Sequence, residues 1–316
     1  FGGGLSYENT NIGGRGMKLS VGFDLGNREE YWVSYEQPYM SGKVTAWKIG
    51  GYKRAWDDLR YYVDDQERFR YDRDKTGAFF GFGRKFKDDS LYNWYLLFDW
   101  HEVKNEPDNP PAGYEKSNWG NIPIDEKVPP TTVLDDLGDG TYYSVTASVR
   151  RLNIDEYLPY SKGDVQTLNV QYGQADVEGV DYSYFKYWLE AKFYFTVDKL
   201  FKDFFETSFG GNTERPVIFA SRIIVGSSSG DVPYEQMYTV GGDTTLRGYD
   251  DDRYHGEEML LGNFELRVPM DKNFSLVAFY DIGRAWRKEG DSASFGSDMG
   301  SSPGFGVRIN TPLGNL

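Results

Sequence analysis

Residues Phe185-Lys-Tyr-Trp-Leu-Glu-Ala-Lys-Phe-Tyr-Phe195 carry apolar side chains at every odd position and mostly charged or amphipathic ones at even positions. A period of two residues is that of a β-strand, whose successive side chains point to opposite faces of the sheet. The same alternation runs through Met17–Leu25 and Tyr143–Arg150. Such stretches exceed the ~5–6 residues of a typical globular strand. They suit the ~9–11 residues of a tilted strand that crosses a membrane.

Segments of this kind extend along the whole chain. We expect thirteen strands, at roughly 1–11, 16–25, 29–39, 43–56, 75–86, 90–104, 141–153, 164–172, 183–196, 216–228, 258–269, 273–286 and 304–311. The predicted short turns are 12–15, 40–42, 87–89 and 270–272, and the predicted long connections are 57–74, 105–139, 229–257 and 287–303. In an up-and-down barrel whose two ends differ, short and long connections alternate, as most of these do. Two connections break the alternation, because 27–28 is short where a long one is expected and 198–215 is long where a short one is expected.

The composition favours strands over helices as the membrane-crossing elements. Aromatic residues make up 17% of the chain, yet the mean hydropathy is −0.63 and no apolar run approaches the ~18 residues of a spanning helix. A soluble β-sandwich is the main alternative, because its strands also alternate. Aromatic residues near strand ends favour the membrane barrel; they are Tyr31, Tyr39, Trp56, Trp94, Trp100 and Trp286. We therefore expect an all-β chain with one domain over 1–316, a transmembrane antiparallel up-and-down β-barrel.

Several function classes are disfavoured by the residue content. The formal net charge of −14 argues against a nucleic-acid surface, which needs clustered cations. The chain has no cysteine, and its only histidines are His101 and His255, so thiol chemistry and a zinc centre are not expected. The abundant paired acids lie in predicted loops without a calcium-binding pattern. We expect no enzyme activity, no catalytic residue, no cofactor and no metal.

The most informative connection contains Val-Gly-Gly-Asp-Thr-Thr-Leu-Arg-Gly-Tyr at 240–249. On the two strands that follow, the alternation places Glu265 and Asp281 on the polar face, which is the lumenal face of a membrane barrel. If the connection folds into the lumen, Arg247 can bridge both carboxylates through its planar guanidinium. The alternative is an exposed loop arginine.

The last part of the chain resembles a known family. The motifs are Gly-Gly-Asp-Thr-Thr-Leu-Arg-Gly-Tyr (241–249), Asn-Phe-Glu-Leu-Arg-Val-Pro (263–269), Phe-Tyr-Asp-Ile-Gly-Arg-Ala-Trp (279–286) and Gly-Phe-Gly-Val-Arg-Ile-Asn-Thr-Pro-Leu-Gly (304–314). In order and spacing they are similar to the C-terminal half of BamA-type outer-membrane assembly barrels. Asn-Ile-Gly-Gly-Arg-Gly at 11–16 is similar to an early turn of that family.

The resemblance implies a barrel of about sixteen strands preceded by POTRA domains. The POTRA domains, the first strand and the last two strands are then missing from this chain. It also implies that Arg247, within the motif that includes Gly248 and Tyr249, is held in the lumen by Glu265 and Asp281 as a structural loop anchor.

The function implied by the resemblance is that of an insertase, which folds β-barrel proteins into the bacterial outer membrane. Its expected partners are outer-membrane lipids, unfolded outer-membrane proteins and periplasmic accessory lipoproteins, with no nucleic acid. Two alternatives stay open. One is a two-partner secretion transporter of the same superfamily, and the other is a passive porin.

Overall fold

The computed structural model of the chain describes residues 3–26, 28–63, 66–108, 137–154, 162–197, 216–270, 274–288, 294–311 and 314–315. The main sheet consists of β1 (Gly3–Ile12), β2 (Met17–Leu25), β3 (Arg28–Gln37), β4 (Ala46–Val63), β5 (Gln66–Lys85), β6 (Tyr92–Asp108), β7 (Gly140–Ile154), β8 (Gly163–Val177), β9 (Val180–Thr196), β10 (Ile218–Gly230), β13 (Glu258–Pro269), β14 (Phe274–Trp286), β15 (Gly300–Thr311) and the short β16 (Gly314–Asn315). The connection between β10 and β13 contains the 3-10 turn η2 (Tyr234–Gln236) and a small ladder of β11 (Tyr238–Val240) with β12 (Tyr254–Gly256).

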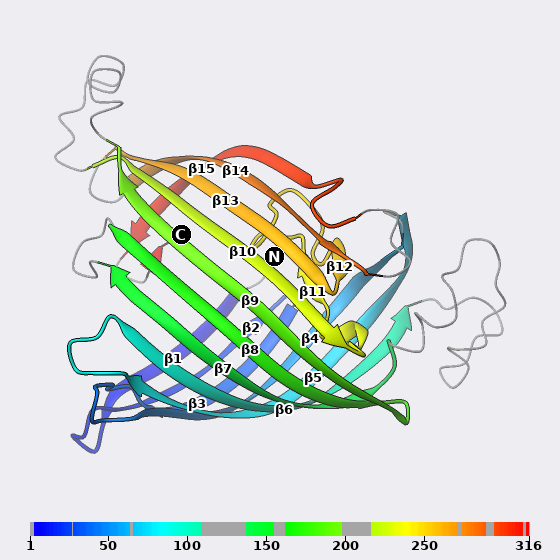
Figure 1. Ribbon diagram of the computed structural model, residues 1–316, viewed down its shortest axis with the longest axis horizontal. Helices are drawn as coiled ribbons and strands as arrows, with labels where there is room; N and C mark the ends of the chain where they lie inside the picture. Colours follow the sequence, from blue (N-terminus) through cyan, green and yellow to red (C-terminus); the bar gives the residue numbers. More distant parts are fainter. Residues whose placement is uncertain are drawn as a thin grey trace, which may run out of the picture.

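Each strand of the main sheet pairs antiparallel with the next in the order β1 to β10, β13, β14, β15 and β16. The thirteen predicted strands are all present, and the two-residue β16 follows them. The sheet curves around an interior in which β11 and β12 lie (Figure 1). Within the described ranges, no ladder joins β1 to β15 or β16, so the sheet is not closed. The predicted antiparallel up-and-down barrel fold is confirmed.

Two predicted connections differ in the structure. The segment 57–74 was expected to be a long loop, but β4 and β5 continue through most of it as a ladder, with register shifts between Trp56 and Leu59 and between Tyr61 and Tyr62. Asp58 takes a positive φ of 60° at the first of these bulges. Similarly, the predicted strands 164–172 and 183–196 left a connection at 173–182, but β8 and β9 extend through it to a tight turn at Glu178 and Gly179. Most of 105–139 and nearly all of 198–215 lie outside the described residues.

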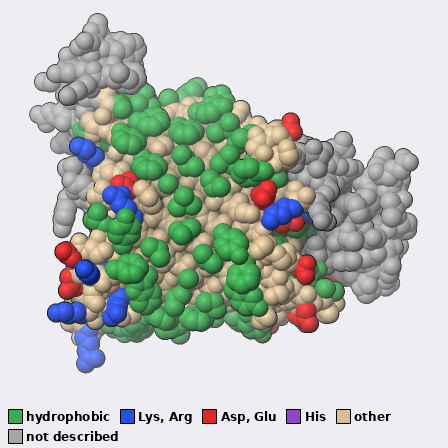
Figure 2. Space-filling view, viewed as in Figure 1, with side chains coloured by type: hydrophobic (Ala, Val, Ile, Leu, Met, Phe, Trp, Pro, Cys, Tyr) green, Lys and Arg blue, Asp and Glu red, His purple; other side chains and the backbone are tan. Residues whose placement is uncertain are grey.

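The two faces of the sheet differ as the alternation predicts. Val21, Phe23 and Leu25 of β2 are exposed on the outer face, and Leu168 and Val170 of β8 are exposed there too. Figure 2 shows apolar side chains spread across the middle of one outer face, with charged side chains gathered toward its two ends. An apolar band between charged rims is typical of a wall that faces lipid.

The predicted aromatic girdle is only partly correct. Tyr31, Tyr39 and Trp100 are exposed at the outer face. Trp56, however, packs against an interior cluster. Trp286 is 1% exposed, and its Nε1 donates a hydrogen bond to the Ser297 carbonyl oxygen at 3.1 Å. The lumenal connection between β10 and β13 covers Trp56, and residues of the connection between β14 and β15, Phe295 and Ser297, cover Trp286.

In the part of the chain that the structure describes, no helix is long and apolar enough to cross a membrane.

Candidate functional site

The connection from Asp231 to Glu257 folds into the interior and packs on the wall; we call it the lumenal loop. Val240 and Leu246 of this loop are fully buried. They form one cluster with wall residues from β10, β13 and β14, which are Ile224, Met259, Leu261 and Ala285. Burial of these apolar side chains holds the loop against three neighbouring strands.

Glycines and a threonine shape the turn that presents the motif at 241–249. Gly242 and Gly248 have φ values of 89° and 86°, a region that other residues rarely adopt. Thr245 closes the turn, because its Oγ1 accepts a hydrogen bond from Gly241 N at 2.8 Å and donates one to Gly241 O at 2.6 Å. The local sequence therefore fixes the backbone from which the next side chain, that of Arg247, projects.

Arg247 lies between Asp281 of β14 and Glu265 of β13. Its Nε donates to Asp281 Oδ2 at 2.6 Å, and its Nη2 donates to Asp281 Oδ1 at 2.8 Å, which is a bidentate pair. Its Nη1 donates to Glu265 Oε1 at 2.8 Å. The Asp281 side chain is 0% exposed. The hydrogen bonds to Asp281 raise the pKa of Arg247 against the opposing effect of burial, so the guanidinium is charged at any physiological pH.

Other lumenal side chains complete what we call the Arg247 cluster. Asn263 Nδ2 donates to Asp281 Oδ1 at 2.9 Å and to the Thr245 carbonyl oxygen at 2.6 Å, so it links the wall to the loop backbone. Arg267 donates to Glu265 Oε2 from Nε at 2.9 Å and from Nη2 at 2.7 Å. The second oxygen of Glu265 is thereby occupied, which leaves the first for Arg247.

Gly248 and Tyr249 connect the same loop to β15. A Cβ on Gly248 would lie 3.1 Å from Ser302 Oγ, so the backbone approaches the wall closely there. The Tyr249 hydroxyl accepts a hydrogen bond from Ser301 N at 3.1 Å. All five predicted site residues are thus together, since the loop meets β13, β14 and β15.

The sequence reasoning missed Asn263, and it missed Phe279, whose ring lies against the guanidinium of Arg247. Asn263 shares its strand face with Glu265, so the alternation could have identified it. It also missed Glu235 of η2, which pairs with Arg73 and Lys75 of β5. No local pattern signals that contact, because Lys75 and Glu235 are 160 positions apart.

In the described ranges, no group of three or more His, Asp or Glu side chains is placed to hold a metal ion. His101 contacts Asp99 at 2.6 Å, and the His255 ring stacks on Tyr234 with the centroids 4.4 Å apart.

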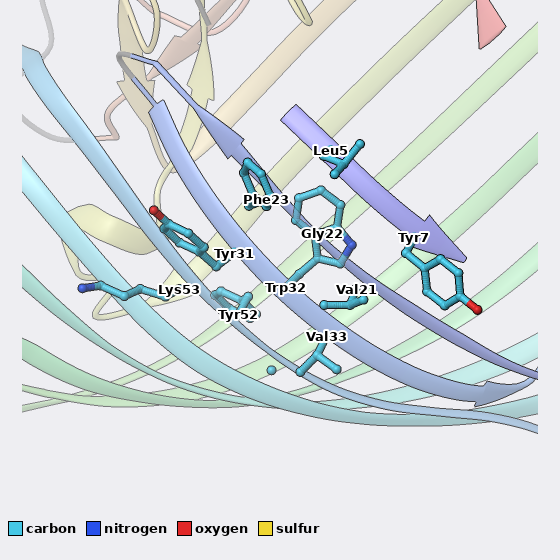
Figure 3. Close-up of a pocket in the computed structure, with 11 residues that line it drawn as sticks. Leu5, Tyr7, Val21, Gly22, Phe23, Tyr31, Trp32, Val33, Tyr52 and Lys53 are labelled. Atoms are coloured by element: carbon cyan, nitrogen blue, oxygen red, sulfur yellow. The ribbon is translucent and has the colours of Figure 1, made fainter. Parts of the chain in front are cut away.

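A groove of about 560 Å³ lies on the outer face of β1 to β4. Figure 3 shows Leu5, Tyr7 and Val21 along it, with Tyr31 and Lys53 toward one end. Apart from Lys53, its lining is apolar, aromatic or glycine, so this groove has the character of the lipid-facing wall and not of a polar binding site.

The family model described as Omp85 superfamily domain matches residues 11–316. Among solved structures, the chain is similar to BamA from Haemophilus ducreyi lacking POTRA domains 1-3, with a TM-score of 0.65 and 17% identity over 99% of this chain and 65% of that one. It is also similar to CdiB from Acinetobacter baumannii, with a TM-score of 0.57 and 12% identity over 98% of this chain and 51% of that one.

CdiB from Escherichia coli gives a TM-score of 0.54 and 13% identity over 97% of this chain and 52% of that one. These likenesses show a shared barrel fold. The chain spans about half to two thirds of the length of these three proteins. No curated protein matches the chain.

Proposed function

Because the chain belongs to the Omp85 superfamily, we propose that it is the barrel of an insertase that folds other β-barrel proteins into the bacterial outer membrane. The Arg247 cluster is the observation that carries this proposal. It fixes the lumenal loop to β13 and β14 through charge-assisted hydrogen bonds in a partly desolvated setting. A lumen occupied by its own loop is suited to a protein whose substrate is handled at the wall.

In this function Arg247 is a structural anchor and performs no bond chemistry. The substrate is an unfolded outer-membrane protein, whose strands pair with exposed strand edges by β-augmentation. Outer-membrane lipids surround the apolar band, and periplasmic accessory lipoproteins are the expected protein partners. The likeness to the BamA barrel supports this choice of function.

A second candidate is a two-partner secretion transporter, which the likeness to two CdiB barrels favours. Such a transporter passes a polypeptide through the lumen. The lumenal loop would then have to leave its contacts with the wall during transport, whereas an insertase can keep them.

Reconstitution of the full-length protein into liposomes separates these functions. A urea-unfolded outer-membrane barrel protein is added, and its folded fraction is followed by heat-modifiable electrophoretic mobility. An insertase should accelerate folding by about tenfold or more over liposomes that carry a porin, which corresponds to a barrier lowered by about 1.4 kcal/mol. Folding no faster than in the porin liposomes would contradict the proposal. Solute-driven swelling of the same liposomes would instead indicate a passive porin.

A further inference from the structure

Glu235 connects the lumenal loop to a part of the wall far from Arg247. Its carboxylate pairs with Arg73, and its Oε1 lies 3.0 Å from Lys75 Nζ; both cations are on β5. The exposed fraction of the side chain is 7% for Glu235, 10% for Arg73 and 16% for Lys75. A buried charge is tolerated only where partners compensate it, so this contact specifies one position for η2.

The neighbouring residue adds a directed hydrogen bond to β6. Gln236 Nε2 lies 3.3 Å from His101 Nε2, and His101 Nδ1 lies 2.6 Å from Asp99 Oδ1. Both contacts are satisfied when Nδ1 donates its proton to Asp99 and Nε2 accepts from Gln236. Two consecutive residues of η2 therefore each engage a different strand.

Apolar packing surrounds these polar contacts. The Tyr234 ring lies 5.1 Å from the Tyr61 ring of β4 and stacks on His255 of the loop itself. Val232 and Met237 belong to the same buried cluster as Tyr61. Because water is kept from Glu235 by this packing, its ion pairs are screened little.

The two sets of contacts hold the loop at separated places. Strands β6 to β10 lie between β5, which holds Glu235, and β13, which holds Glu265 of the Arg247 cluster. We propose that Glu235 is a second anchor, which positions the lumenal loop across the lumen as a plug, and that its release alone opens a path for ions while the Arg247 cluster stays intact.

The charge arrangement predicts the effect of removing this anchor. Glu235→Gln leaves Arg73 and Lys75 buried close together without their carboxylate, so the docked position of η2 becomes unfavourable. Arg247 keeps its own partners on β13 and β14 in that variant. The loop should consequently leave β5 and β6 but remain tied at its other end.

Planar-bilayer conductance of the purified full-length protein tests this inference. Glu235→Gln should raise the fraction of time in an ion-conducting state by about tenfold or more, since one partner of a buried ion pair is lost. Glu235→Asp, which retains the charge, should restore much of the closed state. Asp231→Asn is the matched control, because it removes an exposed carboxylate from the same loop. It should conduct like the unaltered protein.

A labelling experiment gives an independent readout, because this chain has no native cysteine. Val232→Cys lies in the buried cluster and should resist a bulky maleimide, but should react readily when combined with Glu235→Gln. Should Glu235→Gln fail to give a heat-modifiable barrel, Lys75→Met weakens the same contact from the wall and should also raise conductance. Unchanged conductance together with unchanged protection of the thiol would overturn the inference. Neither readout involves a substrate, so its outcome is separate from that of the insertase assay.

Discussion

The guanidinium carbon of Arg247 lies 3.6 Å from the centroid of the Phe279 ring, while the edge of the same group pairs with a carboxylate. Phe279 and Asp281 are two positions apart on β14, so both face the lumen. Arginine can use its edge for bidentate hydrogen bonds and its face for a ring at the same time. This combination explains why the position suits arginine better than another cation.

We expect Arg247→Lys to lower the free energy of unfolding of the barrel by about 1.5–3 kcal/mol, because lysine offers one compact charge and loses a hydrogen bond to a charged partner. Denaturant titration followed by heat-modifiable mobility measures this loss. Arg15→Lys, in an exposed turn, is the matched control and should be neutral. Equal stability of the two variants would show that the planar fork is unimportant.

Phe279→Leu should lower the free energy of unfolding by about 0.5–2 kcal/mol more than the lost apolar contact accounts for, because leucine has no ring face to interact with the guanidinium. The comparison is Phe80→Leu, which alters an exposed ring on the outer face of β5. The same denaturant titration applies to both. If the Phe279 variant loses no more than the Phe80 variant, the stacking contributes nothing measurable.

The alternation of side chains was sufficient to predict the strands and the faces on which Glu265 and Asp281 lie, because a strand has only two faces. The extension of β4 and β5 was not predicted. Beyond the apolar band the two strands carry many charged residues, and a sequence of that composition is typical of a loop. The pairing of Glu235 with Arg73 and Lys75 was also beyond the sequence. Alternation states that a residue faces the lumen but not which distant residue it meets there.

Acid should release the lumenal loop. Burial raises the pKa of Glu235, but the charges of Arg73 and Lys75 outweigh it, so the pKa is lowered to about 2. Burial, followed by Arg73 and Arg287, lowers the pKa of His255 to about 3. Other titratable groups interact electrostatically or by hydrogen bonding with Glu235 or His255. They are His101, Asp252, Tyr71, Tyr142, Tyr184 and Lys186.

Both pKa values are depressed in the docked loop relative to the ordinary values of 4.5 for Glu and 6.5 for His. Through these two groups the docked loop binds fewer protons than a released one, so their contribution to docking is fully present above pH 6.5 and is lost as the pH falls toward 2 to 3; Asp252, whose pKa burial raises, opposes it. Conductance in planar bilayers should rise over this range. His255→Phe should move the onset to lower pH. An onset that is unchanged in this variant would contradict the role of His255.

A charged residue introduced into the apolar outer band should destabilise the barrel. Val21→Arg, on the outer face of β2, should cost about 2–4 kcal/mol of unfolding free energy if it lies near the membrane midplane. Ser20→Asn, on the inner face of the same strand, should be mild. Folding yields in liposomes measure both effects. Similar losses at the two positions would favour a fold buried on both faces.

A double-mutant cycle of Arg247→Ala and Asp281→Asn tests the central claim most directly, scored by unfolding free energy and by substrate folding in liposomes. Arg247→Ala alone leaves the buried Asp281 carboxylate without its cation, close to Glu265, which keeps its ion pair with Arg267. Asp281→Asn should therefore offset part of that loss, with a coupling of about 1–3 kcal/mol. Both readouts should change together if the anchor positions the loop for insertion. Strictly additive losses, or insertion unaffected in a barrel that has lost the coupling, would contradict the claim.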